Sequence, residues 1–309
     1  MRYDLRYLYR TPPSVWEREI QPRLHTAARQ NPGWGLWITL LEATLHRVAE
    51  PVWPVAGLQL QPHRPAAAPP LLAGAVVSID PPAIRHWVRR LLKHLRQDAK
   101  GRLATRAASR RLAALAFFEA ALCLDEPRLG EEAKKVGIDP AALGAVAFLT
   151  AMPLLYACGQ FLSGQLPAAW PYGYCPVCGV WPTLAELCGL ERAHRLRCGR
   201  CGTGWRTTWL RCPYCGEYDH QRLGFLVPEG SVETRKVATC LSCKGYLKTL
   251  TTLQASPGYA IPLDDLATID LDIAAMERGY TRPQQLGYRL DFRVSERCGR
   301  WRFCFGWRA

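Results

Sequence analysis

The stretch YGYCPVCGVWP, residues 172–182, places two cysteines three positions apart in a segment rich in glycine and proline. The same Cys-x-x-Cys spacing recurs three times further along the chain. Two thiolates at this spacing can face one ion, and two such turns complete a tetrahedron of sulfur ligands. The pattern therefore predicts two tetracysteine metal sites. Their candidate ligands are Cys175, Cys178, Cys198, Cys201, Cys212, Cys215, Cys240 and Cys243.

The order of the turns favours sequential pairing, in which the first two turns form one site and the last two form the other. Each long interval within a pair suits a β-hairpin that returns the chain to the metal, as in ribbon folds. Interleaved pairing is the alternative. A glycine follows the second cysteine in three turns, at Gly179, Gly202 and Gly216, where it permits unusual backbone dihedrals. Cys188 has no partner at this spacing, so we do not expect it to be a ligand.

The chemistry of such sites favours a structural role over a catalytic one. Four thiolates close the coordination shell, whereas catalytic zinc keeps one position open. Small ribbon modules also bury too little apolar surface to fold alone and gain stability from bound metal. The sequence has no phosphate loop, no HExxH motif and no nucleophile elbow. We therefore expect that the protein is not an enzyme. The alternative is a redox protein that acts by electron transfer at iron or by thiol exchange at a cysteine turn.

The charge of the chain suggests a second alternative, a nucleic-acid-binding ribbon protein. The 309 residues carry a formal charge of +14, which eight thiolates and two divalent ions would lower to about +10. Basic and aromatic residues in RCGRCGTGWRTTW could meet phosphates and bases. They are Arg197, Arg200, Trp205 and Arg206. Because the basic excess is spread over both halves of the chain, we do not favour a nucleic-acid partner.

The first 168 residues have helical periodicity. Apolar residues recur at three- and four-residue intervals from 36 to 48, and further helices are expected at 80–97, 103–124 and 140–162. Four helices of this kind predict a bundle. The helix at 80–97 has a basic face, interpreted as solvated, with a docking strip as the alternative. That face consists of Arg85, Arg89, Arg90, Lys93, Arg96 and Lys100.

Two segments bear on location. The N-terminal stretch MRYDLRYLYRTPPSVWEREI lacks the apolar run of a secretory signal, so thirteen cysteines are expected in a reducing cytoplasm. Residues 140–162 carry no charge and are long enough to span a bilayer. Their alanine and glycine content and the kink expected at Pro153 favour a buried core helix instead, and we predict no membrane insertion.

Four segments together resemble the formate dehydrogenase accessory protein family, FdhE. They read GYCPVCGVWPTLAEL, LRCGRCGTGWRTTWLRCPYCGE, TCLSCKGYLKTL and DDLATIDLDIAAMERGY. The resemblance is specific over residues 172–283 and weaker over the N-terminal half. It implies a cytoplasmic factor that binds the catalytic subunit of a molybdenum- or tungsten-dependent formate dehydrogenase and is needed for its activity. It also implies that the eight cysteines bind iron as in rubredoxin, with zinc as the alternative because both ions accept tetrahedral sulfur.

Periodicity and resemblance together predict a mainly α fold with small β elements, an N-terminal helical bundle followed by two rubredoxin-like or zinc-ribbon-like metal modules. The expected domains are a helical domain at 1–168, tetracysteine modules at 169–208 and 209–258, and an acidic closing helix with an atypical tail at 259–309. After residue 283 the sequence departs from the family pattern, and we expect an unstructured extension. A strand pair or a partner-binding segment is the alternative there. An aromatic cluster is expected either to anchor a partner or to pack between domains, and it consists of Trp170, Tyr172, Tyr174 and Trp181.

Overall fold

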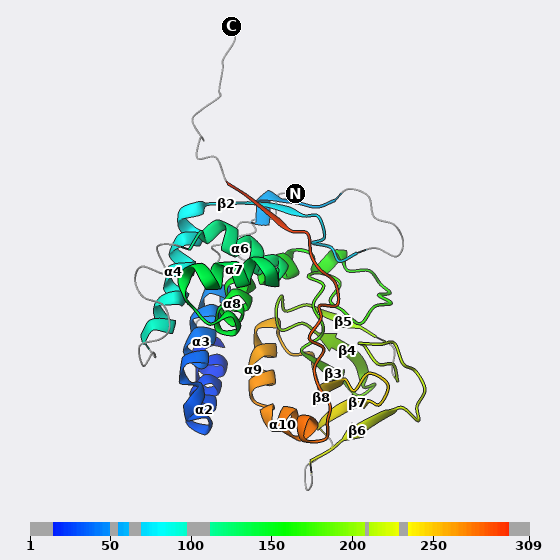
Figure 1. Ribbon diagram of the computed structural model, residues 1–309. Coiled ribbons are helices and arrows are strands. Elements are labelled where there is room, and N and C mark those ends of the chain that lie inside the picture. The colour runs from blue at the N-terminus through cyan, green and yellow to red at the C-terminus, as the bar shows by residue number, and fades with distance from the viewer. Residues whose placement is uncertain are drawn as a thin grey trace.

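The computed structural model describes residues 15–49, 55–61, 69–97, 112–207, 210–228 and 234–296. Figure 1 shows a helical half beside a sheet-rich half, with two short helices next to the sheet. The helices are α2 (Gln21–Gln30), α3 (Gly35–Ala49), α4 (Pro81–Gln97), α6 (Ala114–Cys123), α7 (Glu126–Val136), α8 (Pro140–Phe161), α9 (Ile261–Leu266) and α10 (Ile269–Glu277). The strands are β1 (Leu58–Gln59), β2 (Val76–Ile79), β3 (Leu184–Cys188), β4 (Ala193–Arg197), β5 (Gly204–Arg206), β6 (Leu223–Leu226), β7 (Arg235–Cys240), β8 (Tyr246–Thr252) and β9 (Arg293–Glu296).

Helix α8 is the centre of the helical half. Asp139 caps its first turn by accepting a hydrogen bond from the backbone N–H of Ala142 at 2.9 Å, and Pro140 occupies the first helical position. Helices α3, α4, α6 and α7 pack around it. Within the described residues α8 is the one helix long and apolar enough to cross a membrane, but 61% of its most apolar window is buried inside the protein. Burial of this kind is what a core helix shows, as predicted.

The predicted fold class is wrong, because the N-terminal half is not simply a helical bundle. Strands β1, β2 and β9 form a three-stranded sheet beside the helices. The two cysteine segments are also not separate modules, since they share one six-stranded sheet in the order β5-β4-β3-β8-β7-β6. Strands β3 and β8 pair in parallel and join the two segments. Parallel pairing needs distant chain segments to meet, which local periodicity does not reveal.

The six-stranded sheet crosses one of the predicted domain boundaries, the one at residue 208. Strands from both sides of residue 208 pair within it. The boundaries at residues 168, 208 and 258 stay predictions.

Most of the predicted helices are present in the structure, although the predicted fold class is wrong. Helices α3, α4 and α8 confirm the expectations for 36–48, 80–97 and 140–162. Of the predicted helix at 103–124, the structure describes residues from 112 onward, and α6 begins there at Ala114. Helix α7 follows directly and was not predicted. Arg85, Arg89, Arg90 and Lys93 on α4 are exposed, as a solvated face requires, while Arg96 and Lys100 lie outside the described side chains.

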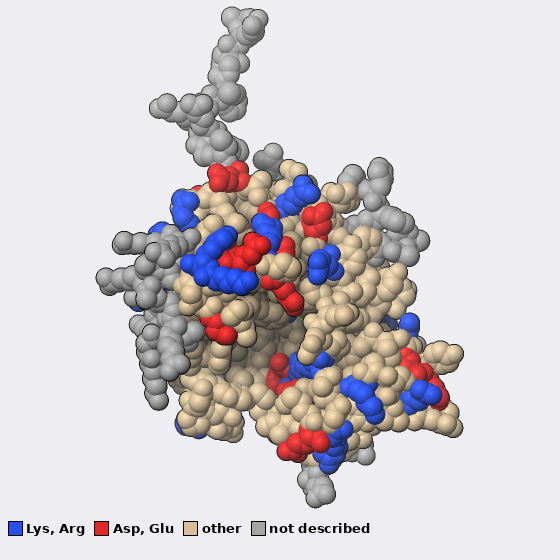
Figure 2. Space-filling view, viewed as in Figure 1, with Lys and Arg blue, Asp and Glu red and all other residues tan. Residues whose placement is uncertain are grey.

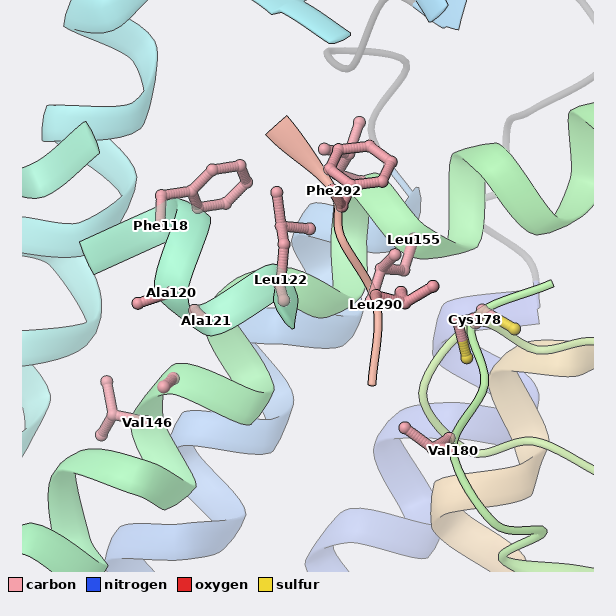
Figure 3. Close-up of a cluster of buried hydrophobic side chains, with 14 of the residues drawn as sticks. Phe118, Ala120, Ala121, Leu122, Val146, Leu155, Cys178, Val180, Leu290 and Phe292 are labelled. Atoms are coloured by element: carbon pink, nitrogen blue, oxygen red, sulfur yellow. The ribbon is translucent and has the colours of Figure 1, made fainter. Parts of the chain in front are cut away.

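The chain after residue 283 is ordered up to residue 296, so the predicted unstructured extension is wrong for this part. Strand β9 pairs in parallel with β2, and Leu290 and Phe292 are buried in the main core. Figure 3 shows these two side chains beside Leu122 of α6 and Leu155 of α8. Residues 290–296 therefore pack onto the helical half and its small sheet. The tail residues Cys298, Trp301, Cys304 and Trp307 lie outside the described residues.

Candidate metal centres

The eight predicted cysteines gather into two groups, and the pairing is sequential. In each group the four sulfur atoms lie within 4.8 Å of one another. In the first group the Sγ atoms of Cys175 and Cys201 are 3.5 Å apart, as are those of Cys178 and Cys198. In the second group the Cys212–Cys243 and Cys215–Cys240 sulfur distances are both 3.7 Å.

These distances fit a shared metal ion and not disulfides. A disulfide holds its sulfurs about 2.05 Å apart. A tetrahedron with metal–sulfur bonds of about 2.3 Å places its corners about 3.8 Å apart. Both groups can therefore bind a tetrahedral ion. Iron and zinc both accept four thiolates, so the sulfur geometry suits either.

The four cysteine turns share one backbone conformation. In each, the first cysteine donates its backbone N–H to a carbonyl five residues further on, as from Cys175 to Val180 and from Cys240 to Gly245. The residue after the second cysteine has a positive φ in every turn, between 55° and 80°, as predicted for the three glycines. In the fourth turn this residue is Lys244, with φ 55°. A lysine there carries strain that glycine avoids.

Backbone N–H groups also point at the sulfurs. Val177 donates to Cys175 Sγ and Gly245 donates to Cys243 Sγ, both at 3.4 Å. Burial raises the pKa of Cys175 and Cys198 well above the usual thiol value. A bound cation offsets this cost by stabilising the thiolate form. The donor set is thus suited to a metal ion.

The two groups differ in their exposure to solvent. All four cysteines of the first group are buried. In the second group Cys212 and Cys240 are buried, while Cys215 and Cys243 are exposed. A reagent in solution can therefore reach the second group directly, whereas the first is covered by the helical half of the protein.

The residues proposed for nucleic-acid contact are mostly unavailable. Arg197 is buried and paired with Glu186, and Trp205 is buried as well. Arg200 is buried against the helical half, where its Nη2 donates to the backbone carbonyl of Ala121 at 2.5 Å. Among these four residues Arg206 alone is exposed. The nucleic-acid alternative thus loses most of the contacts that motivated it.

The aromatic cluster packs within the protein. Trp170 Nε1 donates to the carbonyl of Tyr174 at 2.7 Å, and Trp181 Nε1 donates to that of Gln285 at 2.8 Å. The Tyr174 ring also lies 5.9 Å from the ring of Tyr288. Both indole N–H groups are therefore used internally, as the packing interpretation requires. Cys188 lies in neither sulfur group, and its Sγ is 3.6 Å from the hydroxyl of Thr252.

A buried charge cluster, not predicted from the sequence, joins the second cysteine segment to the closing helices. Lys248 of β8 is fully buried and forms ion pairs of 2.6 Å with Asp265 and Asp272. Arg282 contacts the same two carboxylates at 2.7 and 2.8 Å. The signal was the acidic run in DDLATIDLDIAAMERGY, which needs cations once its helices are buried.

Comparisons with known proteins find relatives that match part of the chain. No protein-family model matches the chain. Curated relatives described as "Protein FdhE homolog" match it from Aquifex aeolicus at 30% identity over 125 residues and from Stutzerimonas stutzeri at 34% over 111 residues. The resemblance to the FdhE family is confirmed. A third FdhE homolog, from Haemophilus influenzae, is 32% identical over 123 residues.

The matches to these FdhE homologs are partial. They cover 38%, 35% and 39% of this chain and 43%, 35% and 39% of the respective relatives. The aligned part therefore spans less than half of each relative.

A solved FdhE structure extends the likeness to the fold as a whole. The crystal structure of the FdhE protein from Pseudomonas aeruginosa superposes with a TM-score of 0.53 over 87% of this chain and 94% of that one. The two sequences are 21% identical. The two proteins thus share a fold at low sequence identity.

Proposed function

We propose that this protein is a cytoplasmic accessory factor that binds the catalytic subunit of a formate dehydrogenase and is required for its assembly or activation. The observation that carries the proposal is the similarity of part of the chain to FdhE homologs, at 30% identity over 125 residues and 34% over 111 residues. The shape of the cysteine groups supports a binding role. Four sulfurs would surround each ion and leave no open position for a substrate. No catalytic step is proposed for the protein.

The role we propose for the metal is to hold the sheet-rich half in one shape. All eight cysteines would act as ligands, and we propose iron in both sites, with zinc as the alternative. Structural metal in such sites contributes roughly 10–16 kcal/mol of apparent binding free energy in small zinc modules. Arg200 then joins that half to the helices. Both halves would present one surface to the client.

Affinity purification from the native cell, with mass spectrometry and elemental analysis of the eluate, tests this function. We expect the formate dehydrogenase catalytic subunit to co-purify with a protein that holds two metal ions. The double variant Cys175→Ser/Cys178→Ser should lose both the first ion and the client. Cys188→Ser is the matched control, because that cysteine lies in neither group. Full client recovery with the double variant, or no client with the unaltered protein, would refute the proposal.

A further inference from the structure

A cleft of about 400 Å³ opens between the helical half and the closing helices. Leu41 of α3 and Phe148 and Leu149 of α8 line one wall, and Leu266 of α9 and Ile269 of α10 line the other. Figure 2 shows the molecule hollowed near the middle of this face. Residues of both cysteine segments complete the lining. The cleft thus lies where the helical half, the two cysteine segments and the closing helices meet.

The charges in the cleft neutralise one another. Asp265 and Arg282 line it, and Arg282 Nη2 contacts carboxylate oxygens of both Asp265 and Asp272. Lys248, which is fully buried and does not line the cleft, pairs with the same two carboxylates. Two cations therefore face two anions. A charged side chain that entered would lose its water without gaining a partner, which is unfavourable.

We propose that this cleft holds a short, uncharged apolar segment of the client polypeptide. The inference rests on the proposed function and adds where the client binds and what kind of segment is taken. Apolar walls with internally neutralised charges complement apolar side chains and disfavour acidic or basic ones. The volume lies within the range of about 300–1,000 Å³ typical of pockets that enclose a ligand. It therefore accommodates a few side chains and not a whole domain.

The apolar surface continues beyond the cleft along α10. Ile273 and Met276 are about half exposed, at 49% and 55%, and follow Ile269 at four- and seven-residue intervals. Residues with this spacing share one face of a helix. An apolar segment seated in the cleft would extend along this face and cover it. A segment longer than the cleft itself thus gains additional contact area.

Peptide binding tests the inference directly. The probes are two fluorescein-labelled peptides, one with a run of leucines and alanines between glycine and serine ends, and one with two of those leucines replaced by glutamate. Fluorescence anisotropy should show the uncharged peptide binding at least about tenfold more tightly, which corresponds to about 1.4 kcal/mol. Overlapping peptides from the formate dehydrogenase catalytic subunit form a second set, in which the binders should be the apolar, uncharged ones.

Wall variants locate the binding. Leu149→Asp and Ile269→Asp place a carboxylate on opposite walls and should each weaken the uncharged peptide about tenfold or more. Leu253→Asp is the matched control, because Leu253 is exposed elsewhere and does not line the cleft. Metal content and the urea midpoint identify any variant that fails to fold, and Leu266→Asn then replaces it as a milder change.

The outcomes separate this inference from the proposed function. If the client co-purifies equally with the wall variants and the control, the cleft assignment is overturned while the proposed function stands. A second outcome is that no client co-purifies, while the uncharged peptide binds the unaltered protein and not the wall variants. The proposed function then fails, and the preference of the cleft for uncharged apolar segments stands. Tighter binding of the glutamate peptide overturns the charge argument. Loss of a dimer in the wall variants, with peptide binding unchanged, assigns the cleft to a second copy of the chain and overturns the inference.

Discussion

Arg200 of the first cysteine segment donates its Nη2 to the carbonyl oxygen of Ala121, near the C-terminal end of α6, at 2.5 Å. The same nitrogen lies 3.1 Å from the carbonyl of Leu122. The last carbonyls of a helix have no partner within the helix, and a cation there is also favoured by the helix dipole. Because Arg200 is 1% exposed, this contact fixes the metal-binding half onto the helical half.

Replacing this arginine should loosen the junction without emptying the sites. Arg200→Met keeps much of the side-chain volume but removes the donors, and we expect a loss of about 2–3 kcal/mol in unfolding free energy. Urea unfolding followed by circular dichroism measures it, and two metal ions should still be bound. Arg206→Met, at an exposed position nearby, is the control and should change stability little. Equal stability of the two variants would show that the junction does not depend on Arg200.

Local chemistry explains which features the sequence predicted well. A cysteine turn closes within six residues, so the spacing of Cys175 and Cys178 and the glycine after them suffice to indicate it. The amphipathic pattern of α4 and the Asp139 cap of α8 are equally local. Helices and metal turns could therefore be predicted residue by residue.

Long-range pairing explains most of what was missed. Strand β2 is four residues long, and its parallel partner β9 lies more than two hundred residues further on. Neither strand has a sequence pattern that predicts its pairing with the other. The segment after residue 283 was therefore expected to be unstructured. The pairing of β3 with β8 is similar. Buried cations such as Arg200 and Lys248 were equally hidden, because a basic residue is ordinarily exposed.

The fourth cysteine turn should be stabilised by glycine. Lys244 has φ 55°, a left-handed conformation that costs a side-chain-bearing residue about 1–2 kcal/mol. We expect Lys244→Gly to raise the unfolding free energy by about 1 kcal/mol, since glycine's greater freedom in the unfolded chain removes part of the gain. Thermal unfolding of the metal-loaded protein measures the change.

The reverse substitution in the third turn provides the comparison. Gly216 has φ 80°, and a Cβ there would meet its nearest neighbour, an Arg211 side-chain nitrogen, at 3.4 Å. Gly216→Ala therefore tests the backbone conformation almost alone and should cost about 1–2 kcal/mol. If both substitutions shifted stability in the same direction, backbone strain would not distinguish the two turns.

Metal removal should occur in two steps. Cys215 and Cys243 are exposed, whereas all four cysteines of the first group are buried. A chelator should therefore take one equivalent of metal rapidly and the other only as the protein unfolds. Iodoacetamide labelling read by mass spectrometry should modify Cys215 and Cys243 before the four cysteines of the first group. Simultaneous loss of both ions with uniform labelling would contradict the difference in exposure.

Acid should weaken the buried charge cluster. Burial alone would raise the pKa of Asp272, but the charges and hydrogen bonds of Arg282 and Lys248 outweigh it, so that the pKa is lowered. A lowered carboxyl pKa contributes stability above the unfolded-state value of about 3.9 and loses it as the pH falls through the folded-state value. We expect Asp272→Asn to be about 3–5 kcal/mol less stable than wild type at neutral pH, because it leaves buried cations short of a partner.

The difference between Asp272→Asn and wild type should shrink as the pH falls below about 4. Urea unfolding at several pH values measures it. Acid also releases metal from thiolates, so the two proteins must be compared at equal metal content. A difference that stays constant down to pH 2 would show that Asp272 is not responsible for the acid sensitivity.

The segment that leads into β9 should be required for the stability of the helical half. Phe292 is 1% exposed and packs in the core with Leu290, and the Cys123 thiol donates to its backbone carbonyl at 3.2 Å. Phe292→Ala should cost about 3–5 kcal/mol, because the cavity it leaves can relax only in part. Urea unfolding measures the loss, and Arg289→Ala is the control, since its side chain is exposed and no such cavity forms. The two metal ions should remain bound, because β9 pairs with β2 in the smaller sheet and not with the strands that carry the cysteines. If Phe292→Ala lost metal while its helical half stayed folded, the segment would support the cysteine groups and not the helical half.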